Sequence, residues 1–362
     1  MNPREITRAR LLEHYRAYPL MEITDLFKYV FQSAWGCEHM VPSEAIVMDV
    51  LRKEQTSCAP SPFLTTTPLD GAYSRVHLSR PDEGVSLETL GKLFLRSARK
   101  TGEGETALIQ KLQVARDMIC DGILPFRLAE FDDAEARWRA LGFPAIHHSD
   151  TFRRAYRPAY RVLATEYVEL LPFLAKIEEG LRNRALHAPR PFIVAIEGGS
   201  AGGKTTLAQL LGELYDCTVF HMDDFFLRPE QRTPDRRAEI GGNVDRERFL
   251  EEVLLPLRRG DAVEYRRFDC ATQTVASPVS VPPKPLTIVE GAYSMHPDLA
   301  PCYDLSVFME ISPSCQRERI LRRNPSPWAE RFFDEWIPLE QAYFKGMNVQ
   351  ARCALSLRVD AP

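Results

Sequence analysis

Residues 198–205 read GGSAGGKT and come directly after an apolar run, Phe192-Ile193-Val194-Ala195-Ile196. The stretch fits the pattern G-x-x-x-x-G-K-[ST] of a phosphate-binding loop that joins a buried strand to a helix. Its glycines let backbone N–H groups turn inward toward a phosphate, and the following helix points its positive end at the same place. In this pattern Lys204 is expected to bind the β- and γ-phosphates, and the Thr205 hydroxyl is expected to be a ligand of Mg²⁺. We therefore predict that a nucleoside triphosphate binds to Gly198, Gly199, Ser200, Ala201, Gly202, Gly203, Lys204, Thr205 and Thr206.

The bulk composition narrows the class of protein. A chain of 362 residues favours two domains, and 44% hydrophobic with 27% charged residues is typical of a globular protein. The formal net charge of −4 argues against nucleic acid as a partner. Eight scattered cysteines without a C-x-x-C pair fit a reducing, cytoplasmic location. The sequence shows no pattern of a signal peptide or a membrane span, and it leaves homo-oligomerisation open.

The chain divides near residue 188. Residues 157–186 carry apolar side chains at helical spacing, and the prolines at 189 and 191 then break the helix. We predict a mostly helical domain of unknown role over 1–187. Its expected helices are Pro3–Ala17, Met21–Ala34, Ser43–Lys53, Ser86–Lys100, Glu105–Cys120, Asp133–Leu141, Phe152–Tyr160 and Arg157–Leu186, with a loop and a short strand over Ser57–Ser79.

Residues 188–362 alternate between strand-like and helix-like segments. The expected strands are Phe192–Glu197, Cys217–Met222, Leu286–Glu290, Asp304–Ile311 and Ala354–Val359, and the expected helices are Thr205–Tyr215, Arg246–Leu257 and Pro313–Arg323. A polar, glycine-containing stretch covers 227–245, and Ala262–Cys270 has the pattern of a hairpin. The alternation predicts an α/β fold, in which helices cover both faces of a parallel sheet.

Two acidic residues stand at the carboxyl ends of expected strands, where ligands bind in open α/β sheets. Asp223 follows the strand Cys217–Met222, and Glu290 ends the strand Leu286–Glu290. A kinase needs an acid near the acceptor hydroxyl and a second one at the magnesium site. Either residue alone is equally well explained as the solvated end of a strand, whereas the pair behind a phosphate loop favours phosphoryl transfer.

Residues 190–360 resemble the uridine kinase and phosphoribulokinase family of P-loop kinases. The resemblance rests on six features in family order: the phosphate loop, HMDDFF, GGNVDRERF, YRRFDC, IVEG and the arginine-rich RERILRRN. It implies a P-loop kinase fold and a Mg²⁺-dependent transfer of the γ-phosphoryl group of ATP to a hydroxyl of a small molecule.

The resemblance also implies roles for single residues. Asp223 matches the acid that accepts or positions the proton of the acceptor hydroxyl, and Glu290 matches an acid of the magnesium site. The acceptor pocket would be lined by Asp245, Tyr265, Phe268 and Asp269. Arg319, Arg322 and Arg323 match lid arginines, which suit phosphate oxygens because a guanidinium binds two oxygens at once. A basic helix face in solvent is the plainer explanation of these arginines.

The segment FDCATQTVASP departs from nucleoside kinases, because the histidine and arginine that commonly follow the aromatic–acid pair have no clear match. The acceptor is therefore a nucleoside such as uridine, another polyol or a pantothenate-like alcohol. The main alternative is a nucleotide-binding regulatory protein whose helical domain senses or binds a partner. A GTPase switch or an ABC-type ATPase is disfavoured, since Asn-Lys-x-Asp and LSGGQ are both absent. A binding module without catalysis is disfavoured by Lys204, Thr205, Asp223 and Glu290.

The part upstream of residue 188 contains histidines near other polar residues, namely His39, His77, His147 and His148. A metal site is one interpretation, and a phosphate or carboxylate site that uses Arg75, Arg153 and Arg154 is another. The spacings match no ligand template, so ordinary structural histidines are the favoured explanation. The segment FRRAYRPAYR could stack on a nucleic-acid strand, but tyrosines packed inward with arginines in solvent explain it better.

Overall fold

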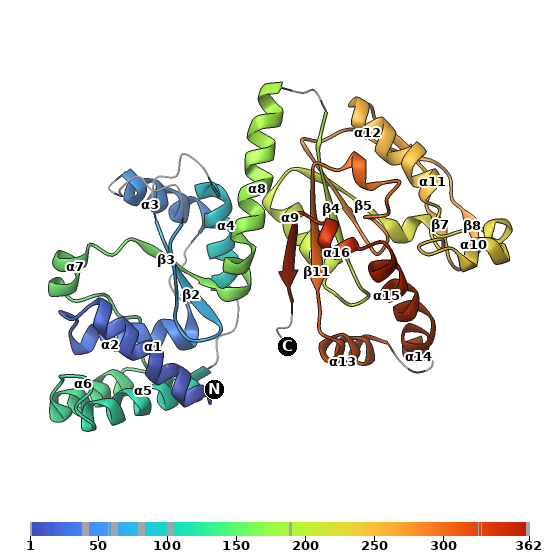
Figure 1. Cartoon of the computed structure of the whole chain (residues 1–362). Helices are drawn as coiled ribbons and strands as arrows, with labels where there is room; N and C mark the ends of the chain where they lie inside the picture. The colour runs from blue at the N-terminus through green and yellow to red at the C-terminus, as the bar shows by residue number, and fades with distance from the viewer. Residues whose placement is uncertain are drawn as a thin grey trace. The chain divides into compact units, whose positions relative to one another are not determined.

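The computed structural model of the chain describes residues 2–37, 43–56, 58, 64–78, 84–99, 104–187, 190–324, 326 and 328–359 (Figure 1). Two compact units, Met1–Ala175 and Lys176–Pro362, make up the chain. The division lies inside helix α8, Thr165–His187, which runs up to the residue where we place the domain boundary. The assignment of 1–187 and 188–362 as domains remains our proposal.

The first unit is mostly helical, and a small sheet accompanies its helices. The helices are α1 Pro3–Ala17, α2 Ile23–Trp35, α3 Glu44–Thr56, α4 Leu87–Ala98, α5 Gly104–Cys120, α6 Leu128–Ala140 and α7 Asp150–Tyr156, and the strands are β1 Thr66–Pro68, β2 Tyr73–His77 and β3 Tyr160–Ala164. The strands form an antiparallel sheet in the order β1-β2-β3. Helix α1 begins at a capping box. The Asn2 side chain accepts a backbone N–H of the first helical turn, and the Glu5 side chain accepts the backbone N–H of Asn2.

The sheet overturns two predictions for this unit. We expected a continuous helix over Arg157–Leu186, but residues Tyr160–Ala164 form β3, and helix α8 begins only at Thr165. The expected helix Phe152–Tyr160 likewise ends at Tyr156, where α7 closes with Arg157 in the left-handed conformation. Both errors have one cause, since β3 pairs with β2, about 90 residues earlier in the chain, and such a partner leaves no local pattern in the sequence.

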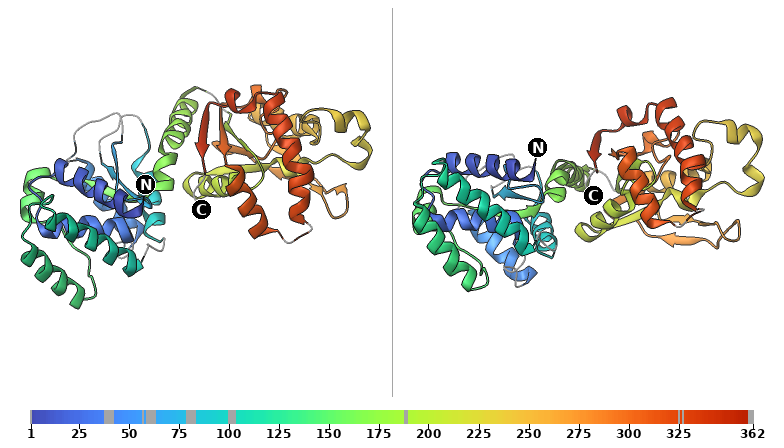
Figure 2. Two further views of the ribbon diagram at one scale, coloured as in Figure 1. Left: turned by 60° about the horizontal axis from the view of Figure 1, so that its bottom comes forward. Right: turned by 90° about the horizontal axis from the view of Figure 1, so that it is seen from below.

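The second unit confirms the predicted α/β fold. Five parallel strands form a sheet in the order β12-β11-β4-β10-β5. These strands are β4 Phe192–Gly198, β5 Cys217–His221, β10 Leu286–Glu290, β11 Leu305–Glu310 and β12 Leu355–Arg358. The helices are α9 Lys204–Leu214, α10 Pro234–Ala238, α11 Arg246–Phe249, α12 Leu255–Arg259, α13 Pro313–Arg323, α14 Trp328–Arg331, α15 Ile337–Gly346 and α16 Val349–Arg352, and Figure 2 shows them around the sheet from two further directions.

The central strand β4 fixes how this unit packs. Every residue of β4 is buried, as expected for a parallel strand covered on both faces. Ile193 and Ala195 belong to a hydrophobic core with Phe220, Phe249 and other buried side chains. Val194 and Ile196 point to the opposite face, because side chains alternate along a strand. Helix α9 packs against β4, β5 and β10, and it therefore holds the loop before it at the carboxyl edge of the sheet.

The predicted hairpin over Ala262–Cys270 is wrong. Its two halves are separate short strands, and each pairs with a later segment instead of with the other. Strand β6, Val263–Tyr265, pairs with β9, Val279–Val281, and β7, Phe268–Asp269, pairs with β8, Thr274–Val275. The helical stretch from α14 to α15 was not predicted, and it contains a π-helical turn at Phe332–Trp336.

None of the described helices is both long and apolar enough to cross a membrane. The eight cysteines all lie in described residues, and none of them forms a disulfide.

Candidate active site

The phosphate-binding loop lies between the buried strand β4 and helix α9, as its sequence pattern predicts. Two of its positions require glycine. A Cβ at Gly198, where φ is +149°, would lie 2.7 Å from the carbonyl oxygen of Met309, and a Cβ at Gly202 would lie 2.8 Å from that of Gly199. Real side chains do not approach a backbone so closely, and the loop can therefore curl tightly only with glycine at these positions.

Side chains from two later helices hold the loop. Ser200 donates its backbone N–H and its hydroxyl to the two oxygens of Glu340 on α15, at 2.9 and 2.6 Å. From α13, Gln316 donates to the Ser200 carbonyl at 2.8 Å, and Arg319 donates to the Ala201 carbonyl at 3.3 Å. Burial raises the pKa of the Glu340 carboxyl, although the bonds from Ser200 and the charge of Lys204 oppose this rise.

The carboxyl ends of β10 and β5 bring the predicted magnesium ligands together. One carboxylate oxygen of Glu290, at the end of β10, accepts from the Thr205 hydroxyl at 3.1 Å. The same oxygen lies 2.6 Å from Nδ1 of His221, which ends β5. The hydrogen bond to Glu290 raises the pKa of His221, and burial opposes this shift. The acid of β10 and the hydroxyl of the loop thus form one oxygen-rich corner.

Asp223 lies beside this corner in a short 3-10 turn, Met222–Phe225, and its side chain is exposed. Desolvation by surrounding protein raises its pKa, Lys204 lowers it, and Glu290 raises it further. These charges act on Asp223 because the groups lie near one another. Lys204 itself donates to the carbonyl of Gly199 at 3.0 Å, which keeps its ammonium against the loop.

The residues present suit a magnesium ion. Mg²⁺ prefers oxygen ligands, and in kinases it is held by one or two protein side chains together with phosphate oxygens. The Thr205 hydroxyl and the Glu290 carboxylate supply such oxygens next to the phosphate loop. The part of the chain that the structure describes has no cluster of three or more His, Cys, Asp and Glu side chains fit to hold a metal without a ligand's help.

The three predicted lid arginines do not share one environment. Arg319 reaches the phosphate loop and also donates to the carbonyl of Val359 at 2.8 Å. Arg322 and Arg323 lie on the last turn of α13 with exposed side chains. Of the three, Arg319 is the one that the fold places against the loop.

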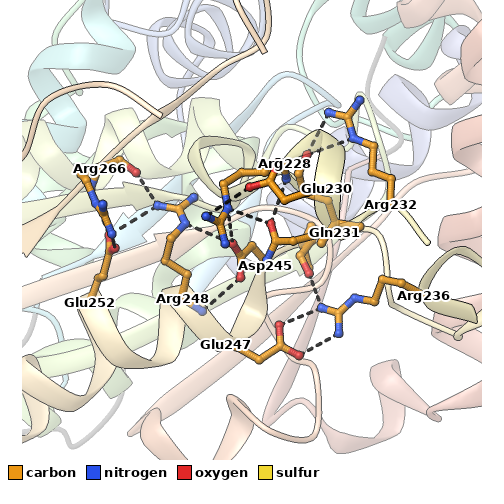
Figure 3. A network of polar contacts seen from close by, with 12 residues as sticks. Arg228, Glu230, Gln231, Arg232, Arg236, Asp245, Glu247, Arg248, Glu252 and Arg266 are labelled. Carbon is orange, nitrogen blue, oxygen red and sulfur yellow. Dashed lines mark hydrogen bonds and ion pairs between the residues drawn. The ribbon is translucent and has the colours of Figure 1, made fainter. Parts of the chain in front are cut away.

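Asp245, the predicted ligand of the acceptor, has structural partners in a network of charged side chains (Figure 3). It is 2% exposed and caps helix α11, where it accepts from the backbone N–H of Arg248 at 3.2 Å and from the Arg248 guanidinium at 3.3 Å. Arg228 lies 3.9 Å from the same carboxylate. Arg248 also packs over the ring of Phe225, 4.2 Å from its centre. An acceptor hydroxyl would therefore have to share Asp245 with two arginines.

The remaining residues predicted for the acceptor pocket lie on β6 and β7. The ring of Tyr265 packs in the hydrophobic core against Phe220, while its hydroxyl accepts from Arg267 at 3.0 Å. Phe268 is buried, with the guanidinium of Arg232 5.8 Å from its ring centre. Asp269 is exposed, and the N–H of Ala271 and contacts from Thr272 lower its pKa. Asp269 thus lies at the surface of the unit, whereas Phe268 and Tyr265 are buried.

Three residues that contact the predicted site were not predicted from the sequence, namely His221, Gln316 and Glu340. His221 could have been found, since it directly precedes the acidic pair in HMDDFF at the end of a strand. Gln316 and Glu340 carry no such signal, because they reach Ser200 from 116 and 140 residues further along the chain.

Glu197, just before the loop, was not predicted as a notable residue either. Its buried carboxyl leads us to expect that the stability of the folded protein depends on pH. It is fully buried and accepts hydrogen bonds from the N–H groups of Gly198 and Met295 and from the Tyr343 hydroxyl. Burial outweighs these donors and raises the pKa of Glu197 to about 7. An unfolded glutamate titrates near about 4.3. The stabilisation that the proton gives is therefore complete below about pH 4 and lost as the pH rises through about 7.

We expect chemical denaturation to show this loss when the wild type is compared with Glu197→Gln. From pH 5 to pH 8 the free energy of unfolding of the wild type should fall by on the order of 2 kcal/mol relative to that of the variant. Glu264→Gln, which replaces an exposed glutamate, should give a constant difference. A constant difference for Glu197→Gln as well would show that its carboxyl titrates alike in the folded and unfolded chain.

The histidines of the first unit are only partly brought together. His77 and His148 lie on the ring of Tyr160, with centroid distances of 5.9 and 6.0 Å. His147 is exposed, and His39 lies outside the described residues. Arg153 pairs with Asp150 on the exposed face of α7, so it is not part of this cluster.

Comparison with known proteins finds relatives that are named as kinases. No family model matches the chain. Uridine kinase-like protein 3 of Arabidopsis thaliana is 26% identical over 145 residues, 37% of this chain and 31% of its own length. The bifunctional alpha-galactosidase/sucrose kinase of Mediterraneibacter gnavus is 27% identical over 211 residues, 51% of this chain and 22% of its own length. The chain thus spans less than a third of these two relatives.

The uridine kinase of Chloroflexus aggregans is 30% identical over 145 residues, which cover 37% of this chain and 68% of that enzyme. A solved structure of a possible uridine kinase from Bacillus stearothermophilus is 19% identical, with a TM-score of 0.38, over 51% of this chain and 99% of that one. These sequence relatives are named as kinases, which agrees with the phosphate-binding loop of this chain. The chain belongs to the uridine kinase and phosphoribulokinase family of P-loop kinases.

Proposed function

We propose that the protein is an ATP- and Mg²⁺-dependent kinase that transfers the γ-phosphoryl group to a hydroxyl of a small molecule. The observation that carries the proposal is the gathering of Lys204, Thr205, Asp223 and Glu290 at the carboxyl ends of β4, β5 and β10. Ligands bind at this edge in open α/β sheets, and phosphoryl transfer depends mainly on positioning and on charge stabilisation.

The loop and its neighbours would hold the nucleotide. The backbone N–H groups of 199–204 would cradle the phosphates, and Lys204 would bind the β- and γ-phosphate oxygens. Thr205 and Glu290 would hold Mg²⁺, which when bound neutralises charge on those oxygens. Arg319, already against the loop, is the arginine placed to add charge stabilisation. Arg322 and Arg323 would need a movement of α13 to do the same.

Asp223 would act on the acceptor. Its exposed carboxylate lies near Lys204 without a hydrogen bond to it, so a hydroxyl group can approach between the carboxylate and the γ-phosphate. The hydroxyl oxygen forms a bond to the γ-phosphorus while the bond from this phosphorus to ADP breaks, and the proton passes to Asp223. The raised pKa of Asp223 makes its carboxylate a better base than an ordinary aspartate.

The acceptor itself is a nucleoside, a sugar or another polyol. Relatives are named both as uridine kinases and as a sucrose kinase, so the family alone does not choose between them. Asp245, Phe268 and Asp269 are our proposed acceptor residues, with Tyr265 behind them. The two arginines on Asp245 would bias this pocket toward acceptors that carry several hydroxyl oxygens, because guanidinium groups donate and carboxylates accept.

A screen of alcohols tests the proposal. The full chain with ATP and Mg²⁺ is offered uridine, cytidine, sucrose, fructose and pantothenate in turn, and ADP release is followed. We expect at least one acceptor to raise ADP release roughly tenfold or more over the rate with water alone, since an acceptor in place completes the site. Tight ATP binding without acceptor-dependent release by any alcohol would instead favour the nucleotide-binding regulator.

We also propose a cytoplasmic location, supported by the scattered cysteines, none of which is paired.

A further inference from the structure

The first unit contains a buried guanidinium that has no anionic partner among the described residues. Arg75 on β2 is 1% exposed. It donates to the side-chain oxygen of Gln32 through Nε at 3.1 Å and through Nη2 at 2.7 Å. Among the described residues no carboxylate oxygen comes within 4.0 Å of this guanidinium. A buried charge is costly unless it is paired, and a neutral amide does not neutralise it.

The carboxylates near Arg75 already serve other donors. Asp70 accepts from Thr7 at 2.5 Å and lies 3.3 Å from the ammonium of Lys111. Asp25, fully buried, accepts from the backbone N–H and the hydroxyl of Ser149. It also bonds to Nδ1 of His148 at 2.8 Å.

A second cation adds to the positive charge. Lys28 donates to the carbonyl of Ile146, and both burial and the charge of Arg75 lower its pKa, to about 8. The charge of Asp25 acts on Lys28 and raises its pKa, against the effects of burial and of Arg75. Among the described residues named here, Arg75, Lys28 and Lys111 stand against Asp25 and Asp70, which leaves one positive charge in excess.

His14 is a second buried polar group that has no hydrogen-bond partner among the residues that the structure describes. It is 4% exposed and stacks on Tyr29, with ring centroids 4.3 Å apart. Neither of its ring nitrogens has a hydrogen-bond partner within the described part of the chain. Burial, Arg75 and His148 lower its pKa, so the ring is neutral at pH 7 and keeps one N–H to donate. His14 and Arg75 both contact the ring of Tyr29, and both are more than nine-tenths buried.

The side chains around Arg75 hold its guanidinium in place without a ligand. The ring of Tyr160 lies against the guanidinium, 4.5 Å from its centre, and that of Tyr29 lies 5.4 Å away. A chain of hydrogen bonds runs from Asp25 through His148 to the Tyr160 hydroxyl, at 2.8 and 2.6 Å. These contacts fix the guanidinium from α2, β2 and β3, and a ligand would not have to order it. Preorganised donors bind more tightly because less freedom is lost on binding.

We propose that the first unit binds a small oxyanion, a phosphate, a sulfate or a carboxylate, at Arg75, with His14 as a second donor. The guanidinium is the side chain best suited to two oxygens of one anion, and the surplus positive charge needs one negative charge to balance it. His77 and His148 border this site, whereas Arg153 is not part of it. The proposal concerns the first unit only and does not depend on the kinase activity.

Histidine resonances allow the test on the full chain. The chain has 8 histidines, of which His14, His77 and His148 lie near Arg75, while His221 marks the phosphate loop of the second unit. Protein labelled with ¹³C at histidine is titrated with inorganic phosphate, then with sulfate and acetate, at constant ionic strength. Resonances are assigned with His14→Gln and His148→Gln. We expect at least one anion to shift the His14 and His148 signals saturably, and the three probes separate tetrahedral from planar anions.

Two variants decide whether Arg75 is responsible. Arg75→Met should weaken the binding seen at His148 at least about tenfold, the loss of one paired charge. Arg161→Met is the matched control, since Arg161 is also largely buried but already pairs with Glu54 at 2.8 Å, and it should change the affinity less than about twofold. Arg75→Lys serves the same purpose if the methionine variant does not fold.

The proposal is wrong if the anions shift His221 alone, which would place their binding at the phosphate loop, or if they shift no histidine in the first unit. It is also wrong if Arg75→Met and Arg161→Met bind with equal affinity.

Discussion

Asp223→Asn should lower the turnover number by roughly 10²- to 10⁴-fold, the usual contribution of a general base. Asparagine keeps the shape of the side chain but cannot take the proton of the acceptor hydroxyl. Binding of ATP should change little, because Asp223 makes no hydrogen bond to the phosphate loop or to Thr205. Turnover is measured by ADP release with the acceptor found in the screen, and ATP affinity is measured by calorimetry in the absence of acceptor.

The pH profile gives this prediction a second readout. A base must be ionised, so kcat/KM of the wild type should fall as the pH drops through the pKa of Asp223, which desolvation raises above its ordinary value. The residual activity of Asp223→Asn should lack this acidic limb.

Asp224→Asn is the companion variant, because it removes the same charge one residue later. The Asp224 carboxylate lies 3.5 Å from Arg267. We expect this variant to keep most of the turnover. The opposite ranking of the two variants would assign the base to Asp224, and normal turnover by both would exclude a carboxylate base in this turn.

Lys204→Ala should lower kcat/KM by roughly 10²- to 10³-fold, the range found when one preorganised donor to a developing charge is removed. The lysine contacts the β- and γ-phosphate oxygens, and it should bind them more strongly as negative charge develops on the leaving oxygen of ADP. Both ATP affinity and turnover should therefore fall. Steady-state kinetics in ATP, with calorimetric ATP binding, separate the two effects.

Lys284→Ala is the matched control for this variant. Lys284 pairs with Asp216 at 2.8 Å on the surface of the same unit, and its loss should leave both quantities within about twofold. ATP binding and turnover unchanged in Lys204→Ala would remove the basis for calling 198–205 the nucleotide site.

The sequence predicted much of the second unit because its signals are local. Strand β4, the glycine-rich loop and helix α9 follow one another without a break, so hydrophobic run, turn residues and helix periodicity can be read in order. The bounds of α13, Pro313–Arg323, are those expected, since Ser312 caps it and Pro313 suits its first turn. The positions of Asp223 and Glu290 follow from the rule that ligands bind at the carboxyl edge of a parallel sheet.

The environment of the candidate site could not be predicted in the same way. Asp245 has the spacing of an acceptor ligand, yet its carboxylate caps α11 and pairs with Arg248 and Arg228. Arg319, Arg322 and Arg323 look alike in the sequence, but one reaches the phosphate loop and two are exposed. The polar partner of a side chain depends on segments far away in the sequence, and the local hydrophobic periodicity does not predict which segments these are.

By itself the sequence determined the α/β fold of the second unit, the nucleotide loop and the identity of the acids at its edge, because short-range pattern fixes each of them. Tertiary structure alone decided that Glu340 and Gln316 hold Ser200, that residues 160–164 form a strand, and that Arg75 lies buried beside His14 and His148. The physical reason is the same in all three cases. A strand's partner and a buried charge's surroundings come from segments far apart in the chain, and only folding brings them within reach.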